Sequence, residues 1–240
     1  MPAAYGRALD AGLTELGLVV EESARRQLAD HVRLLLAWNA AVNLTAVRDP
    51  AGIAVRHIVD SLSGVAILRE RGIGAFVDLG SGGGYPGLPI AVVLPARRVM
   101  LVESIAKKAR FLSVVATATG LGEPITVRPG RAEAAAGEPG ERERWPAVTA
   151  RAVAELAELI ELAFPLLAPG GCLVAWKRNP AASELAAGER AAVALGGGRL
   201  EIRDVEARGL EGHRLVVVTK IGRTPDGFPR PPGARRRRPW

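Results

Sequence analysis

The sequence feature that most constrains the fold is a glycine-rich segment that ends the first third of the chain. It covers residues 77–87 and reads VDLGSGGGYPG. A short apolar run over residues 76–80 leads into it, and a helical pattern over residues 88–94 follows it. Glycine lets a backbone turn sharply and approach a ligand closely, so a strand, a glycine turn and a helix in this order favour a nucleotide-binding loop.

Apolar runs and helical patterns alternate along the middle of the chain. The strand-like runs are residues 76–80, 99–103, 125–127, 147–149 and 172–176, and the helical patterns are residues 88–94, 107–119 and 154–167. This alternation predicts a parallel sheet with right-handed crossovers. Two further runs, residues 200–207 and 215–220, predict a C-terminal antiparallel hairpin. The predicted fold class is a doubly wound, Rossmann-like α/β sheet.

The chain divides into three parts. Residues 1–72 carry apolar positions at helical spacing and predict a helical N-terminal extension packed on the core. Residues 73–221 form the predicted α/β domain. Residues 222–240 are rich in Pro, Gly and Arg and end in RRRRPW. Since this tail holds little apolar surface to bury, we predict that it is basic and disordered.

The composition narrows the partners and the compartment. Lys and Arg number 32 against 25 Asp and Glu, a net charge of +7 that favours an anionic partner such as nucleic acid. The single cysteine, Cys172, excludes a disulfide framework, and the three dispersed histidines predict no metal site. We expect no membrane span and a cytoplasmic protein, because no apolar signal segment follows Met1 and prolines interrupt the apolar run 88–96.

Two kinds of nucleotide loop match the glycines. Gly82, Gly84 and Gly87 fit the G-x-G-x-x-G of an NAD(P)-dependent oxidoreductase. Asp78, followed by Gly80, Gly82 and Gly84, fits a loop that binds S-adenosylmethionine. A carboxylate is unfavourable beside a pyrophosphate but favourable beside an ammonium and a sulfonium. The acid therefore favours an S-adenosylmethionine-dependent methyltransferase, with the oxidoreductase as the alternative.

Further candidate cofactor-binding residues follow the next two strands. Glu103 ends the second strand, where its carboxylate can accept hydrogen bonds from both ribose hydroxyls of either nucleotide. Ala132 and Glu133 follow the third strand, where a backbone amide and an acceptor would meet the adenine ring. The predicted cofactor site therefore joins the glycine loop to these residues.

Four segments, in this order along the chain, resemble motifs of a known family. They are WNAAVNLTAVRD (38–49), RHIVDSL (56–62), the glycine loop ending in YPGLP (85–89), and KKARFL (107–112). The family is the bacterial ribosomal RNA small-subunit methyltransferase G family, also called glucose-inhibited division protein B. The resemblance runs from about residue 9 to residue 220, and its members usually carry Phe at the position of Tyr85.

The resemblance implies methylation of N7 of a guanine in a loop of 16S ribosomal RNA, with S-adenosylmethionine as the cofactor. It implies that Gly80 and Tyr85 contact the cofactor and that Ala132 and Glu133 meet the adenine. It also implies that Arg151 lies beside the cofactor and faces the target. Guanine N7 carries a free lone pair, so we expect Arg151 to position the substrate and expect direct in-line transfer without a general base.

Cationic residues near the predicted site are candidates for RNA contacts, although a solvated charged surface is the ordinary alternative. They are Arg56, His57, Lys107, Lys108, Arg110, Lys177 and Arg178. The expected partner is 16S ribosomal RNA or the small ribosomal subunit, bound by a monomer. An RNA-binding protein with an inactive cofactor site is a weaker third possibility, because the glycine loop is intact.

Overall fold

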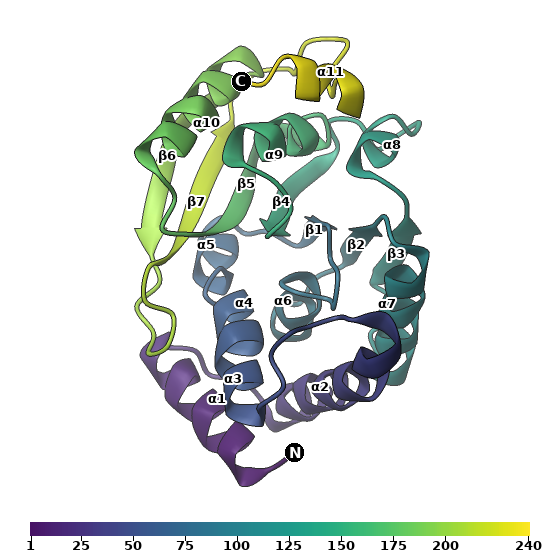
Figure 1. The fold of residues 1–240 in the computed structure, drawn as a ribbon, viewed down its shortest axis with the longest axis vertical. Helices are drawn as coiled ribbons and strands as arrows, with labels where there is room; N and C mark the ends of the chain where they lie inside the picture. Colours follow the sequence, from purple (N-terminus) through teal and green to yellow (C-terminus); the bar gives the residue numbers. More distant parts are fainter.

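A seven-stranded mixed sheet crosses the centre of the computed structural model, which describes residues 1–240 (Figure 1). The strands are β1 (Ala75–Leu79), β2 (Arg98–Glu103), β3 (Ile125–Pro129), β4 (Trp145–Arg151), β5 (Leu167–Arg178), β6 (Gly197–Asp204) and β7 (His213–Lys220). Their order is β3-β2-β1-β4-β5-β7-β6, with β1 to β5 parallel and β7 antiparallel to both neighbours. This confirms the predicted doubly wound sheet and its C-terminal hairpin.

The central strands bury side chains on both faces of the sheet. Phe76 and Leu101 pack into one apolar cluster, whereas Val77 and Val102 pack into the other. Successive side chains on a strand point to opposite faces, so two buried faces require apolar residues at every position. That requirement explains why these strands read as continuous apolar runs in the sequence.

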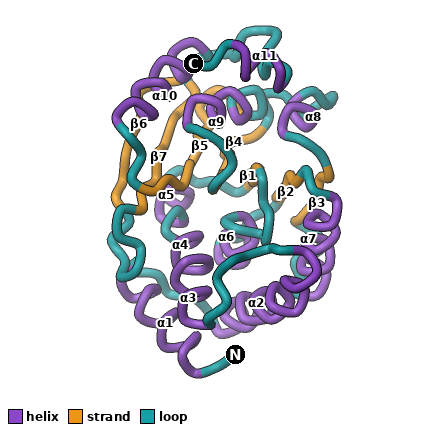
Figure 2. The backbone as a smooth tube through the Cα atoms, viewed as in Figure 1, coloured by secondary structure: helices purple, strands orange, loops and turns teal.

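Helices cover both faces of the sheet, as Figure 2 shows in purple around the orange strands. One face is covered by α1 (Ala3–Glu15), α2 (Glu22–Val42), α3 (Pro50–Ile53), the π-helix η1 (Ala54–Val59), α4 (Asp60–Leu62), α5 (Val65–Glu70), α6 (Gly87–Val93) and α7 (Ala106–Ala118). The other is covered by α8 (Ala132–Ala136), α9 (Leu156–Ala163) and α10 (Ala182–Ala194).

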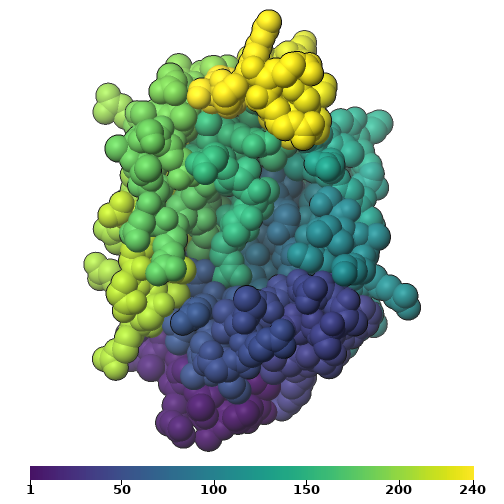
Figure 3. Space-filling view, in the orientation of Figure 1, coloured from purple at the N-terminus to yellow at the C-terminus, as the bar shows by residue number.

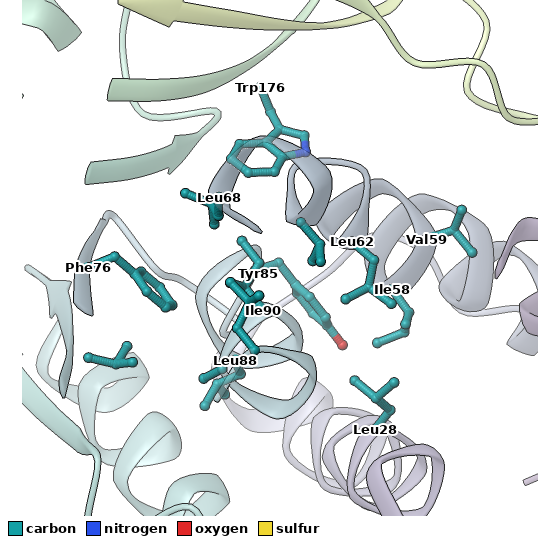
Figure 4. Close-up of a cluster of buried hydrophobic side chains, with 14 of the residues drawn as sticks. Leu28, Ile58, Val59, Leu62, Leu68, Phe76, Tyr85, Leu88, Ile90 and Trp176 are labelled. Carbon is teal, nitrogen blue, oxygen red and sulfur yellow. The ribbon is translucent and has the colours of Figure 1, made fainter. Parts of the chain in front are cut away.

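The N-terminal helices share one core with the sheet. Leu28 of α2 and Ile58 of η1 are fully buried around Tyr85, which comes from the glycine loop (Figure 4). Helix α2 accounts for part of the helical spacing of apolar residues in the segment 1–72. Its apolar stripe faces the loop that forms the candidate site, so the extension helps to hold that loop in place.

One helical segment, Pro50–Glu70, has the length and hydropathy of a membrane-spanning helix. Within its most apolar window, 61% of the segment is buried inside the protein. This burial accounts for the apolar composition, because a core helix of a globular fold needs the same residues. The segment forms the layer between α1 and the sheet.

The C-terminal segment, residues 222–240, differs from the expectation of disorder. It folds back over α9 and ends in a short helix, α11 (Pro232–Arg237), beside α8 and α9 (Figure 1). Phe228 and Trp240 pack against the apolar cluster of this face, and their rings stack 6.1 Å apart. Ion pairs to carboxylates that lie far away in the sequence supply the rest of the attachment, and composition alone does not reveal such pairs.

Candidate active site

The glycine loop leaves β1 at the point where the strand order reverses, the usual place for a ligand in an open α/β sheet. Gly80, Gly82 and Gly84 have φ angles of 65°, 55° and 92°, a region that favours glycine. A Cβ atom at Gly80 would lie 2.7 Å from Cγ2 of Val153. The loop therefore needs glycine both for its turns and for its close approach to the segment after β4.

Glu103 fastens the loop to the end of β2. Its side chain is 5% exposed, and its Oε2 accepts a hydrogen bond from the backbone N–H of Gly82 at 2.8 Å. Its Oε1 accepts another from the backbone N–H of Ile105 at 2.7 Å. A carboxylate oxygen can accept more than one hydrogen bond, so the predicted contact with ribose hydroxyls remains open to each oxygen.

Asp78 lies beneath the loop and does not line a cavity. It is fully buried, and its Oδ1 accepts a hydrogen bond from the Thr149 hydroxyl at 2.7 Å. Its Oδ2 has no partner. Burial raises the pKa of this carboxyl from 3.8 to about 6, although the Thr149 hydrogen bond opposes the change. Asp78 therefore places a weakly compensated carboxylate under the cofactor loop.

A cavity of about 300 Å³ opens at the carboxyl ends of β1, β2 and β3. It is lined by Leu79, Gly80, Val102, Ser104, Gly130, Arg131, Ala132, Glu133, Val153, Ala154, Glu158, Leu162 and Arg235. The structure thus brings together three residues predicted to bind the cofactor, Gly80, Ala132 and Glu133. A glycine turn at Gly80 and the carboxylates of Glu133 on α8 and Glu158 on α9 fit an adenosyl group and a cationic methyl donor, whereas Asp78 and Glu103 lie behind the loop and do not line this cavity.

Tyr85 points away from this cavity. Its ring lies between the rings of His31 and His57, with 4.7 Å between centroids on each side, and Leu28 and Leu62 lie around it (Figure 4). Burial raises the pKa of Tyr85 and lowers the pKa of both histidines to about 4. A contact between Tyr85 and the cofactor would therefore have to come from its backbone.

A second cavity, of about 410 Å³, lies beside the first, across the turn that follows β4. It is lined by Arg56, His57, Asp60, Arg151, Ala152, Trp176, Lys177, Arg178 and His213. Ala152 lines this cavity and its neighbour Val153 lines the first one. Ala152 has a φ of 56°, a strained conformation for a residue with a side chain. This turn therefore separates two adjoining sites.

Asp60 organises the second cavity. Its side chain is 2% exposed, Arg151 Nη1 donates to its Oδ2 at 2.7 Å, and His213 Nδ1 donates to its Oδ1 at 2.9 Å. The indole N–H of Trp176 donates to the backbone carbonyl of Asp60 at 2.6 Å. Four separate elements thus meet at one residue, and its carboxylate fixes the direction of the Arg151 guanidinium.

The structure separates the seven predicted RNA contacts into two groups. Arg56, His57, Lys177 and Arg178 line the second cavity, whereas Lys107, Lys108 and Arg110 lie on α7, outside both cavities. Lys177 is held internally, since its Nζ contacts Glu184 at 2.6 Å and the Ala154 carbonyl at 2.7 Å. Its role in bracing the turn after β4 leaves it less free to meet a phosphate.

Several residues of the two cavities, Asp60 and Glu158 among them, were missed by the sequence-based prediction. Trp176 and His213 line the second cavity, and Arg235 lines the first. His213 reaches Asp60 because the hairpin register places it opposite Arg178, the last residue of β5. The only available signal for His213 was its place two residues before a predicted strand, residues 215–220.

The fold and the first cavity define a class of protein, the S-adenosylmethionine-dependent methyltransferases. An O-methyltransferase of Bacillus cereus, solved in complex with SAH, has a TM-score of 0.58 at 18% identity, over 80% of this chain and 91% of the other. TomG, an O-methyltransferase of Streptomyces achromogenes solved in complex with SAM, has a TM-score of 0.56 at 17% identity, over 92% of this chain and 100% of the other. At such identities the likeness establishes the fold.

Sequence comparison identifies the family. The family model GidB, described as rRNA small subunit methyltransferase G, matches residues 24–212. Proteins named ribosomal RNA small subunit methyltransferase G are similar over nearly full length. The one from Roseiflexus sp. strain RS-1 is 41% identical over 93% of this chain and 94% of the relative, and the one from Geobacillus kaustophilus is 37% identical over 95% of each. The chain belongs to the GidB family. Nothing in these comparisons supports the oxidoreductase alternative.

Proposed function

We propose that this protein methylates N7 of a guanine in a loop of 16S ribosomal RNA, by direct in-line transfer without a general base. The observation that carries the proposal is the chemistry of the second cavity. It is rich in cations and adjoins the cofactor cavity. The assignment of ribosomal RNA as the substrate comes from the names of the relatives. The assignment of guanine N7 as the nucleophile is argued from the residues of the cavity.

The charge of the second cavity suits a polyanionic substrate. Arg56 and Arg178 are exposed at its rim, and Arg151 lies deeper, 18% exposed. Phosphate contacts of this kind position a nucleic acid, while contacts to base edges select the base. Arg151 is the cation beside the turn that separates the two cavities. We assign it the role of holding the target base or its phosphate.

Three side chains of this cavity are candidates for removing a proton. His213 donates from Nδ1 to Asp60, and the other two, His57 and Asp60, are engaged in hydrogen bonds. His57 Nδ1 donates to the Arg56 carbonyl, so its Nε2 accepts the Thr45 hydroxyl hydrogen bond at 2.7 Å. Burial, followed by the positive charge of Arg151, lowers the pKa of His57 to about 4, which makes it a poor base at neutral pH. Both oxygens of Asp60 accept hydrogen bonds from charged or polar partners.

A guanine N7 suits such a site because its lone pair needs no deprotonation. When bound, S-adenosylmethionine supplies a methyl group on a positively charged sulfur that such a lone pair can displace. The chain itself has to present the base, align it across the turn at Ala152 and exclude water; alignment of this kind supplies much of an enzymatic acceleration. Trp176 gives the cavity a flat apolar wall against which a splayed base can lie.

The experiment is a search for the modified atom. Purified protein is incubated with methyl-labelled S-adenosylmethionine and either deproteinised 16S ribosomal RNA or small subunits, and the RNA is treated with borohydride and aniline. We expect label at one guanine and chain cleavage there, because this treatment cleaves at N7-methylguanine. Label without cleavage would overturn the N7 proposal. The Arg151→Ala variant, compared with Arg190→Ala on α10, tests the positioning role.

We further propose that the protein works in the cytoplasm as a monomer on ribosomal RNA or the small subunit. The single cysteine, Cys172, is buried and unpaired, in keeping with a reducing compartment. Gel filtration with light scattering checks the monomer, and comparison of the two RNA substrates in the labelling assay identifies the form of RNA that is modified.

A further inference from the structure

The C-terminal segment, residues 222–240, reaches the cofactor cavity through Arg235. This side chain on α11 is only 7% exposed, whereas residues 236–238, also arginines, are exposed. Its Nε donates to Glu158 at 2.9 Å, and its Nη2 donates to Oε1 of Glu133. All three residues line the cavity of about 300 Å³. An arginine of the supposed tail is thus part of the cofactor site.

The rest of the segment is docked by a buried acid on α9. Glu161 is fully buried, and its Oε2 accepts from Arg230 Nη2 at 2.6 Å and from the Trp240 indole N–H at 2.7 Å. Burial alone would raise the pKa of Glu161, but the Arg230 hydrogen bonds hold it below its ordinary value. Arg230 and Trp240 of this segment supply the hydrogen bonds that Glu161 needs when it is buried. Helix α9 is therefore built to receive this segment.

Arg235 also separates two cavities. Arg235 and Glu158 line both the cofactor cavity and an outer cavity of about 610 Å³, which Arg230, Ser183 and Trp240 help to enclose. The C-terminal segment, yellow in Figure 3, sits over this region of the molecule. The guanidinium and its two carboxylates form the partition, so a shorter side chain at position 235 would join the two spaces.

We propose that Arg235 is a positioning residue of the cofactor site, and that residues 222–240 form the wall at its adenine end. Arg235 holds Oε1 of Glu133, which leaves Oε2 to accept a hydrogen bond from the exocyclic amine of adenine. A carboxylate on a five-residue helix would otherwise turn toward solvent. The inference uses the predicted role of Glu133 and is independent of which RNA atom is methylated.

The first test measures cofactor-product affinity in the full chain without RNA. Titration calorimetry with S-adenosylhomocysteine compares Arg235→Ala with Arg236→Ala, an exposed arginine on the same helix with the same change of charge. We expect Arg235→Ala to raise the Kd by about tenfold or more, as for loss of a charge-assisted hydrogen-bond partner. Arg236→Ala should stay within about twofold, as for an isolated surface charge. Unchanged or tighter binding by Arg235→Ala would overturn the proposal.

The second test separates a local wall from a general effect on folding. N6-benzyl-S-adenosylhomocysteine carries a group that the wild-type partition excludes and the outer cavity can accept. We expect the ratio of its Kd to that of S-adenosylhomocysteine to fall about tenfold or more in Arg235→Ala, because the two cavities then join. An unchanged ratio would show that Arg235 acts only through the stability of the fold, and would overturn its assignment to the adenine end.

Discussion

Asp78 is a buried carboxyl group whose ionisation opposes folding, and the Asp78→Asn variant measures that cost. The side chain is fully buried under the glycine loop, with one hydrogen bond from the Thr149 hydroxyl and no cationic partner. Burial raises its pKa from 3.8 to about 6. Asparagine keeps the shape and an oxygen for Thr149 but never ionises, so the variant removes only the part of stability that depends on pH.

The sign follows from which state binds the proton more tightly. Below pH 3.8 the carboxyl is protonated in both states and ionisation costs nothing. As the pH rises toward about 6, the unfolded chain loses its proton first, so the stability of the folded protein falls. Above that pH the cost is complete. A pKa difference of about two units corresponds to about 3 kcal/mol, at about 1.36 kcal/mol per unit.

The assay is urea unfolding of the cofactor-free protein at about pH 4 and about pH 7. We expect the stability of Asp78→Asn relative to wild type to rise by about 2.4 kcal/mol between these values, because part of the full cost is already present at pH 4. Any constant cost of an unpaired asparagine amide cancels in this comparison. Asp226→Asn, at an exposed carboxyl, should show no such rise. A relative stability of Asp78→Asn that does not change with pH would refute the reasoning.

Three further predictions concern ligand binding and catalysis. Glu103→Ala should weaken binding of S-adenosylmethionine by about 1.5–3 kcal/mol, because it removes a charged acceptor and releases the Gly82 N–H; unchanged affinity in titration calorimetry would exclude Glu103 from the site. His57→Ala should cost far less than the roughly 10²–10⁴-fold expected for a general base, with a single-turnover rate nearly flat across neutral pH; a unit-slope pH dependence lost in the variant would contradict direct transfer. Lys107→Ala combined with Arg110→Ala should reduce the salt dependence of RNA binding and leave the methylated nucleotide unchanged; a different nucleotide would show that these residues select the target.

The parts of the fold that sequence analysis predicts are those with local signals. Strand β1 and helix α2 have strong apolar patterns, and Glu103 was found by its place at the end of a strand. Helix α10 was missed because its alanines give only a weak apolar stripe and because it contains Gly188, a residue unfavourable in a helix. A Cβ atom at Gly188 would lie 2.5 Å from Cδ2 of Leu156 in α9. Glycine is needed there for close packing of two helices, which a single sequence does not reveal.

The C-terminal segment was misjudged for a different physical reason. Its composition holds too few apolar residues for an independent fold, and the disorder prediction follows from that alone. The structure stabilises it through acids elsewhere in the chain: Arg230 pairs with Glu161, and Arg235 pairs with Glu133. Ion pairs between residues this far apart in the sequence form only in the tertiary structure. Neither the docking of the C-terminal segment nor the role of Arg235 therefore has a local sequence signature.

The buried carboxylates show where the fold leaves negative charge uncompensated. Asp60 and Glu161 are both buried and both pair with arginine side chains. Glu103 and Asp78 are also buried, but the first accepts hydrogen bonds from backbone N–H groups and the second from the Thr149 hydroxyl. These two are the acids at the glycine loop, where a methyl donor with an ammonium and a sulfonium would bind. Since an unpaired charge is expensive in a poorly solvated site, ionisation of Asp78 lowers the stability of the fold beneath this loop.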